Sequence, residues 1–284
     1  MIKLNRLHLQ NYRGFSDVKI DFNDRFTCIA GINGAGKTTI LSAICKNLAL
    51  FSNKANFTGK EEYRLKRNDI HKEVGQSLIK GEASVRLVFN IDDKEIESQN
   101  CITVKGDKSP TSVFVDSFDL LNKDSPVNDP FFLYTNLTSS VTDYDDFFSW
   151  IRKREDIENE KLIDAQKNKI VDYKYDEQLQ AVRKAIESFF GNGYELRVSR
   201  VENTLLVKNK DTEISFSDLS DGEKSLLLLF GDIARKLAVA TSFQFQNMPI
   251  KVEDILNGNG IILIDEIELH LHPKIGRASC RERV

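Results

Sequence analysis

The segment from Gly31 to Thr38, GINGAGKT, constrains the fold of this chain more than any other stretch. It matches the phosphate-binding pattern G-x-x-x-x-G-K-[ST] without a mismatch. Glycines in such a loop let successive backbone N–H groups curl around an anion, because no Cβ atom blocks the approach. The pattern requires a strand before it and a helix after it. The sequence therefore predicts an α/β domain that binds a nucleoside triphosphate at this loop.

The residues on both sides of the loop are consistent with that context. Phe26 to Ala30 is a short apolar run, which we interpret as a buried strand that enters the loop. Thr39 to Phe51 has apolar residues at helical spacing, which predicts a helix that leaves the loop. The N-terminus of that helix would place about half a positive charge next to a bound phosphate.

Each part of the loop has an expected role in nucleotide binding. The backbone N–H groups from Asn33 onward would surround the phosphates, Lys37 would reach the β- and γ-phosphates, and the Thr38 hydroxyl would bind Mg²⁺. The predicted nucleotide-binding residues of the loop are Asn33, Gly34, Ala35, Gly36, Lys37, Thr38 and Thr39.

A second segment, Leu219 to Ser225 (LSDGEKS), is typical of the start of a helix. Ser220 and Asp221 are both suitable N-cap residues, and the apolar residues that follow have helical spacing. A serine hydroxyl at a helix N-terminus forms an anion site, and this one could meet a γ-phosphate from outside the loop.

A third segment, Ile261 to Ile264, is typical of a buried parallel strand. Asp265 and Glu266 follow it, at the edge where open α/β sheets bind their ligands. We expect Asp265 to hold Mg²⁺ through water. We expect Glu266 to be the catalytic residue, because a carboxylate there would orient and polarise the water that attacks the γ-phosphate.

Composition excludes some classes of protein. The chain has 284 residues, of which 40% are hydrophobic and 29% charged, with a net charge of −3. No apolar run approaches the ~18 residues of a membrane-spanning helix, and the strand-like N-terminus predicts no signal peptide. The four cysteines, Cys28, Cys45, Cys101 and Cys280, lack C-x-x-C spacing. We therefore expect reduced thiols, a cytoplasmic location and no membrane partner.

The remaining segments alternate between strand and helix patterns. Strands are predicted over Ile2 to Gln10, with a shift around Arg6, and over Val18 to Phe22. Further strands are predicted over residues 83–91, 101–104, 111–115 and 194–207. Residues 142–190 are predicted to be helical, and the Gly-Asn-Gly sequence at 191–193 would end the last helix.

Taken together, the three motifs resemble those of one known family. GINGAGKTT, LSDGEKS and IILIDE resemble the Walker A, signature and Walker B motifs of ABC-type ATPase heads. Asn11 to Phe15 (NYRGF) narrows the resemblance to the branch that includes RecF, the SMC proteins and the OLD nucleases. Glu268 to Pro273 (ELHLHP) resembles OLD-like ATPases of the AAA_21 and AAA_23 type. Phe147 to Glu160 (FFSWIRKREDIENE) is similar to a stretch common in bacterial ATPases of this group, several of them anti-phage proteins.

The resemblance implies a fold and a domain organisation. The fold class is α/β, a P-loop NTPase with the mixed central sheet, antiparallel β subdomain and helical insert of an ABC-type head. Residues 1–274 would form one head. Within it, residues 1–141 would be the N-terminal lobe with Walker A, residues 142–192 the helical insert, and residues 193–274 the part with the signature helix and Walker B.

The resemblance also implies an assembly. Heads of this kind form a homodimer around two ATP molecules with Mg²⁺, so each ATP would lie between the loop of one subunit and the signature of the other. Arg13 would approach the nucleotide, and His270 would lie in a loop that crosses the dimer interface. The signature residues that act on the partner's ATP would be Ser220, Gly222 and Glu223.

We expect an ATPase whose dimerisation drives a DNA-directed process, either DNA repair or anti-phage defence, with a nuclease and DNA as candidate partners. The alternative is an ATP-dependent sensor or scaffold that regulates an effector with little turnover. The basic clusters at Lys60 to Arg67 and Arg152 to Arg154 could follow a DNA backbone or form solvated helix faces. His270 and His272 could bind a metal or be structural.

The C-terminal region departs from the family pattern. A back-translation of Ile275 to Val284 resembles a sequencing adapter, so we expect the natural sequence to diverge after Lys274 and to continue; a genuine basic tail is the alternative. The strands with the family's switch histidine would then be missing, and we expect weak or no turnover from this chain. Gln76 and Gln99 are candidates for the glutamine that usually completes the Mg²⁺ shell.

Overall fold

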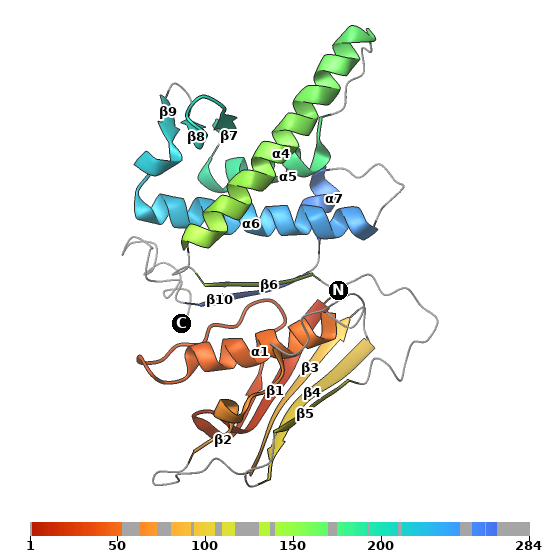
Figure 1. Ribbon diagram of the computed structural model, residues 1–284, viewed down its shortest axis with the longest axis vertical. Coiled ribbons are helices and arrows are strands. Elements are labelled where there is room, and N and C mark those ends of the chain that lie inside the picture. The colour runs from red at the N-terminus through yellow and green to blue at the C-terminus, as the bar shows by residue number, and fades with distance from the viewer. Residues whose placement is uncertain are drawn as a thin grey trace. The chain divides into compact units, whose positions relative to one another are not determined.

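A computed structural model places the described residues in two compact units (Figure 1). The first consists of Met1–Tyr134 together with Asn259–Asp265, and the second includes Thr135–Gly258. The structure describes residues 2–52, 63–72, 81–91, 94–105, 110–116, 131–136, 140–169, 175–191, 193–209, 212–244, 252–258 and 260–265. No helix in these ranges is long and apolar enough to cross a membrane.

The first unit contains a five-stranded antiparallel sheet. Its strand order is β2 (Phe15–Asp21), β1 (Ile2–Tyr12), β3 (Gly81–Ile91), β4 (Lys94–Val104) and β5 (Thr111–Asp116). From Ala83 to Phe89, every second residue of β3 is buried, as a strand with one face on the core requires. The pairing of β1 with β3 is irregular between Leu4 and Arg6, which confirms the shift predicted around Arg6.

Helix α1 (Lys37–Ser52) covers one face of this sheet (Figure 1). Ile40, Ile44 and Leu48 follow one another at intervals of four residues and are all buried. They lie in one cluster with Leu7 and Leu87 of the sheet. The helix predicted to follow the glycine-rich loop is therefore confirmed, and its apolar stripe is the face that holds it on the sheet.

The segment Phe26 to Ala30 is not a strand, so that prediction is wrong. Phe26 is 71% exposed. Local hydrogen bonds shape the chain just before it, because the backbone N–H of Asn23 donates to the Thr27 hydroxyl (2.9 Å) and that of Arg25 to the Asn23 side chain (3.3 Å). A short apolar run forms a strand only where a neighbouring strand pairs with it, and no described strand does so here.

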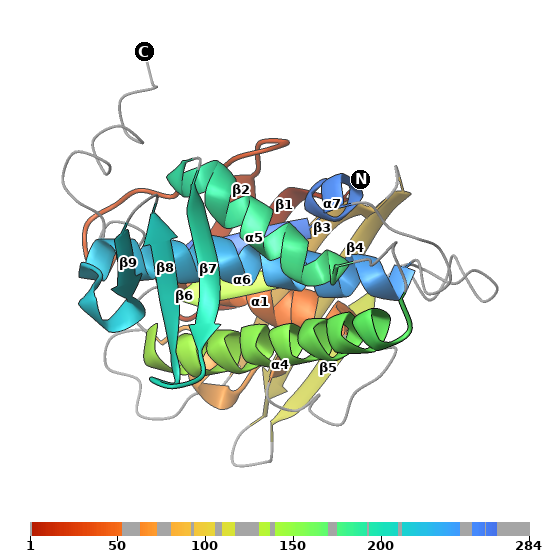
Figure 2. The ribbon, with the colours of Figure 1, turned by 90° about the horizontal axis from the view of Figure 1, so that it is seen from above.

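The second unit combines helices with a small sheet. Its helices are α4 (Ser140–Lys167), α5 (Glu177–Phe190), α6 (Asp221–Gln244) and α7 (Val252–Leu256). Strands β7 (Tyr194–Ser199), β8 (Thr204–Asn209) and β9 (Thr212–Ser215) lie side by side in Figure 2. Helices α4 and α5 confirm the helical region predicted at residues 142–190, except at residues 168–169 and 175–176 between them, which are not helical. Gly191, with φ 109°, follows the end of α5 as expected.

Helices α4 and α6 approach each other closely at Gly231. A Cβ atom at this glycine would lie 2.5 Å from Cζ of Phe147, a ring that is fully buried. Around this contact, Ile151 of α4, Val182 of α5 and Leu227 of α6 form a common core. The second unit thus has its own hydrophobic core, separate from that of the first.

Buried ion pairs connect α4, α5 and β7. The guanidinium group of Arg183 donates to Glu155 (3.1 Å) and to Glu158 (3.0 Å). Glu155 also accepts hydrogen bonds from the backbone N–H of Val198 (3.2 Å) and from Arg200 (2.8 Å). Both carboxylates belong to the FFSWIRKREDIENE stretch, so the charged residues of that stretch include structural ones.

Two arginines of the same stretch also make contacts within the unit. Arg154 pairs with Asp176 at 3.1 Å, and its guanidinium carbon lies 5.5 Å from the centre of the Trp150 ring. Arg152 donates to the side chain of Asn203 at 2.5 Å. These contacts favour an intramolecular role for Arg152 and Arg154 over one in DNA binding.

We expect Arg183→Met to lower the free energy of unfolding by about 3 kcal/mol, because Glu155 and Glu158 would remain largely buried without their shared cation. Lys184→Met is the matched control, since its exposed ion pair with Glu253 contributes at most about 1 kcal/mol. Urea unfolding followed by circular dichroism measures both values. Equal losses in the two variants would contradict a stabilising role for the buried pairs.

Candidate nucleotide-binding site

The glycine-rich loop leads directly into α1, which begins at Lys37. Gly34 and Gly36 have φ values of 83° and 93°, a region that glycine adopts without steric cost. The Lys37 ammonium donates to the carbonyl oxygens of Gly31 (2.7 Å) and Ile32 (3.2 Å), so it lies within the curve of the loop. Asn33, Gly34, Ala35 and Thr38 are exposed, and Gly36, Lys37 and Thr39 are half-buried. The predicted binding residues thus form one accessible turn with a cation inside it.

The turn between β1 and β2 lies against this loop. A Cβ atom at Gly36 would lie 2.5 Å from Cζ and 3.0 Å from Cε2 of Phe15. Gly36 is therefore required for two reasons, its positive φ and the aromatic ring beside it. Phe15 is the last residue of the NYRGF segment, so this segment helps to shape the loop.

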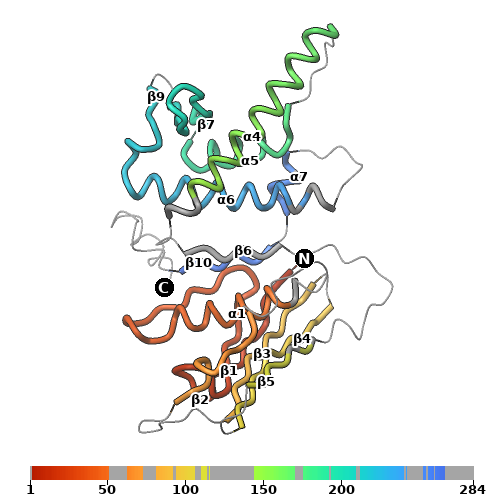
Figure 3. Tube along the Cα trace, in the orientation of Figure 1, coloured from red at the N-terminus to blue at the C-terminus, as the bar shows by residue number. Residues whose placement is uncertain are grey.

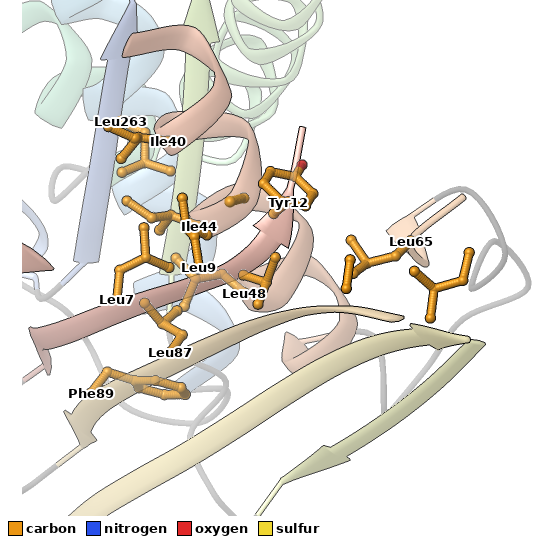
Figure 4. Close-up of a cluster of buried hydrophobic side chains, with 14 of the residues drawn as sticks. Leu7, Leu9, Tyr12, Ile40, Ile44, Leu48, Leu65, Leu87, Phe89 and Leu263 are labelled. Carbon is orange, nitrogen blue, oxygen red and sulfur yellow. The ribbon is translucent and has the colours of Figure 1, made fainter. Parts of the chain in front are cut away.

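Strand β10 (Gly260–Asp265) lies beside α1 in the first unit (Figure 3). It pairs with β6 (Phe131–Asn136) in a two-stranded sheet. Ile261 and Leu263 are buried in the same cluster as Ile40, and Figure 4 shows Leu263 next to Ile40. Because Ile40 belongs to the first turn of α1, this packing brings the end of β10 towards the residues that start the helix.

Asp265 is the last residue of β10, and its side chain fits a metal ligand. It is 3% exposed, and its Oδ2 atom has no hydrogen-bond partner among the described residues. Buried carboxylate oxygens are normally hydrogen-bonded, so this one is available to a cation or to the cation's water. Thr38 is an exposed residue in the first turn of α1. The donor set of Thr38 and Asp265 therefore fits Mg²⁺, which prefers oxygen ligands.

Several predicted residues lie outside the described residues: Glu266, His270, His272 and Gln76. Gln99 is described, and its position argues against a place in the Mg²⁺ shell. It alternates along β4 with the buried residues Ser98 and Asn100. It therefore points away from the face of the sheet that α1 covers.

Arg13 lies in the turn between β1 and β2, at φ 49°, and is held by Asp69. Its Nε donates to Oδ1 of Asp69 at 2.8 Å, and Lys46 of α1 donates to Oδ2 at 2.7 Å. Burial alone would raise the pKa of the Asp69 carboxyl, but hydrogen bonds from Lys46, the Lys66 backbone N–H and Arg13 outweigh it and hold the pKa below its usual value. Asp69 was not among the predicted site residues, because no motif marks it. The approach of Arg13 to the nucleotide stays a prediction.

The signature segment lies in the second unit, at the start of α6. Ser220 is the N-cap, since its hydroxyl accepts a hydrogen bond from the Glu223 backbone N–H (3.3 Å). The Glu223 carboxylate accepts in return from the Ser220 backbone N–H (2.9 Å) and hydroxyl (2.7 Å), which lowers the pKa of Glu223. This is a capping box, and the S-x-x-E spacing could have predicted it. Gly222 lies between them in the first turn.

The chain resembles known proteins in sequence. The model of the family AAA_23, an AAA domain, matches residues 6–226. The "Retron Vc95 probable ATPase" of Vibrio cholerae serotype O1 biovar El Tor is 26% identical over 348 residues, which cover 96% of this chain and 66% of that protein. The "Septu protein PtuA" of Bacillus thuringiensis is 26% identical over 290 residues, with coverages of 96% and 66%. The chain thus spans slightly less than two thirds of the length of these curated relatives.

Solved structures of SMC heads share the fold. The SMC head domain from Thermotoga maritima has a TM-score of 0.50 and 18% identity, over 98% of this chain and 92% of that one. An SmcHead bound to the C-winged helix domain of ScpA has a TM-score of 0.53 and 16% identity, over 95% and 90%. These likenesses confirm the predicted fold class, a P-loop NTPase with an ABC-type head.

We expect Gly36→Ala to weaken ATP binding more than Gly34→Ala. The Gly34 change adds only backbone strain, about 1 kcal/mol, because nothing lies within 4 Å of the new Cβ. The Gly36 change adds the same strain and a clash with Phe15, worth about 1–3 kcal/mol more. Isothermal titration calorimetry with ATP compares the two. Equal effects would show that the Phe15 contact does not matter for the loop.

Proposed function

Since the chain belongs to the AAA domain family AAA_23, we propose that it is an ATPase that binds ATP with Mg²⁺ and hydrolyses it. One observation carries the proposal. The first unit combines a phosphate-binding loop around the Lys37 ammonium with a nearby strand that ends in Asp265, whose buried Oδ2 lacks a hydrogen-bond partner in the described structure. A cation and an unpaired carboxylate oxygen, both near the start of one helix, suit a triphosphate and its metal ion.

The residues of this site would divide the work between them. The Lys37 ammonium would exchange the carbonyls of Gly31 and Ile32 for phosphate oxygens, together with the backbone N–H groups of the loop. Thr38 and Asp265 would hold Mg²⁺, which neutralises negative charge on the phosphates. Glu266 directly follows Asp265 and would orient the attacking water and accept its proton.

We propose further that a second copy of the chain completes each ATP site through Ser220, Gly222 and Glu223. Three observations support this. The Ser220 side chain is exposed, it stands at the N-terminus of α6, and the capping box with Glu223 holds its hydroxyl in place. Such a helix start attracts an anion, as a γ-phosphate would require. His270 would lie in the loop that crosses this interface.

The relatives also support a proposal about the process in which the chain acts. Because one relative is named as a retron ATPase and another as a Septu protein, we propose that this chain acts in anti-phage defence rather than in general DNA repair, within the cytoplasm. A nuclease and DNA remain its proposed partners. The two subunits would close around ATP and separate after its hydrolysis. This change between closed and open dimer would control the nuclease.

Lys37→Ala should abolish ATP binding, because it removes the cation of the loop. Glu266→Gln should keep ATP affinity but accumulate an ATP-bound dimer, because only the hydrolytic step is lost. Calorimetry measures the first effect, and light scattering after size exclusion measures the second. Equal loss of binding in both variants would contradict the assigned roles. ATP binding and dimerisation without turnover in the unaltered chain would instead support the sensor or scaffold function.

Ser220→Arg should leave ATP binding by the monomer unchanged and reduce ATP-dependent dimerisation to the level seen without nucleotide. A long cationic side chain at the N-cap would block approach of the partner's γ-phosphate and end the reciprocal hydrogen bonds with Glu223. Ser217→Arg, at another exposed serine three residues earlier, is the matched control. Equal dimer formation by the two variants would rule out Ser220 as part of the composite site.

A further inference from the structure

Asp69 is a buried carboxylate, 3% exposed, that joins three segments of the first unit. Oδ1 accepts from Arg13 Nε in the turn between β1 and β2 (2.8 Å). Oδ2 accepts from Lys46 Nζ on α1 (2.7 Å) and from the backbone N–H of Lys66 (2.9 Å), just before the 3₁₀ turn η1 (Arg67–Asp69). Two cations therefore share one carboxylate, which leaves a net positive charge in the group.

The backbone of Arg13 is fixed by the same segment. Its N–H donates to the carbonyl oxygen of Asp69 (2.8 Å), and its own carbonyl accepts from the ring Nδ1 of His71 (2.6 Å). On either side, the backbone N–H of His71 donates to Asn11 (2.7 Å), and Tyr12 forms a bridge with Ile70. These bonds hold Arg13 in its left-handed conformation, φ 49°, which a non-glycine residue seldom adopts without such support.

Asp69 binds one edge of the Arg13 guanidinium group, and the other edge is available to a ligand. Only its Nε is used by Asp69, and its central carbon lies 5.3 Å from the centre of the Tyr12 ring. The side chain is 37% exposed. Neither Nη atom has a hydrogen bond within the described part of the chain. A planar guanidinium fixed by Nε presents its Nη groups as a ready donor pair for a phosphate.

Arg13 lies in a segment that contacts the glycine-rich loop. Phe15, two residues after Arg13, packs on Gly36 of the loop. Lys46, the other cation on Asp69, lies on the helix that starts at Lys37. The segment that carries Arg13 is therefore attached both to the loop and to the helix behind it.

We propose that Asp69 is a positioning residue for the nucleotide: it holds Arg13 by Nε so that the Nη groups face a phosphate oxygen of the ATP in the loop. This rests on the proposed function. An unrestrained arginine loses side-chain entropy when it binds, and prior fixation by Asp69 and the Tyr12 ring reduces that loss.

A double-mutant cycle on the 284-residue chain tests this inference, with ATP affinity measured by calorimetry. Arg13→Ala and Asp69→Ala should each weaken ATP binding about tenfold, and the double variant should bind no more weakly than Arg13→Ala alone. If Asp69→Ala lowers ATP affinity as much in the Arg13→Ala background as in the unaltered chain, the proposal is overturned, because Asp69 would then act without Arg13. If Asp69→Ala does not fold, Asp69→Asn takes its place in the cycle.

Lys46→Met is the matched control, because it removes the other cation of Asp69 and keeps the bond to Arg13. ATP affinity should stay within about twofold of the unaltered chain. A loss as large as that of Asp69→Ala would overturn the proposal, since Asp69 would then act through α1. Lys37→Ala separates the two hypotheses: unchanged ATP binding in that variant would refute the proposed nucleotide site itself rather than the role of Asp69.

Discussion

The packing of β10 against α1 is the interaction on which the proposed nucleotide site depends. Leu263 lies on Ile40 in a shared apolar cluster, and each buried aliphatic side chain of this kind contributes about 1.5–3 kcal/mol. This non-directional attraction joins segments from opposite ends of the chain. As a result, the strand that ends in Asp265 comes to the helix that starts at Lys37, beside the glycine-rich loop.

Buried charges distinguish the structural from the functional parts of the molecule. Glu155, Glu158 and Asp69 are all buried and all have cationic partners. They stabilise the contacts between segments, because a buried carboxylate without a partner would cost several kcal/mol. Asp265 differs, since its Oδ2 has no partner among the described residues. Among the described residues, the other buried acids are paired, and this difference supports the ligand role proposed for Asp265.

The features that could be predicted from the sequence are those whose causes lie within a few residues of each other along the chain. The positive φ values of the loop glycines, the apolar stripe of α1 and the irregularity near Arg6 all follow from patterns within a few residues. The strand predicted at Phe26 to Ala30 was wrong, because an apolar run does not specify a pairing partner. The capping box at Ser220 was within reach of the sequence, since the S-x-x-E spacing alone indicates it.

The sequence by itself determined the glycine-rich loop, the helix behind it and the order of the three motifs, because each depends on residue types at short, regular spacing. Only the tertiary structure decided which charges pair. Asp69 pairs with Arg13 and Lys46, and Arg183 pairs with Glu155 and Glu158. In each of these pairs, the two partners are more than 20 residues apart along the chain. No local propensity encodes such a contact. It exists because burial of apolar surface brings the segments together, and each buried charge then requires a partner within hydrogen-bonding distance.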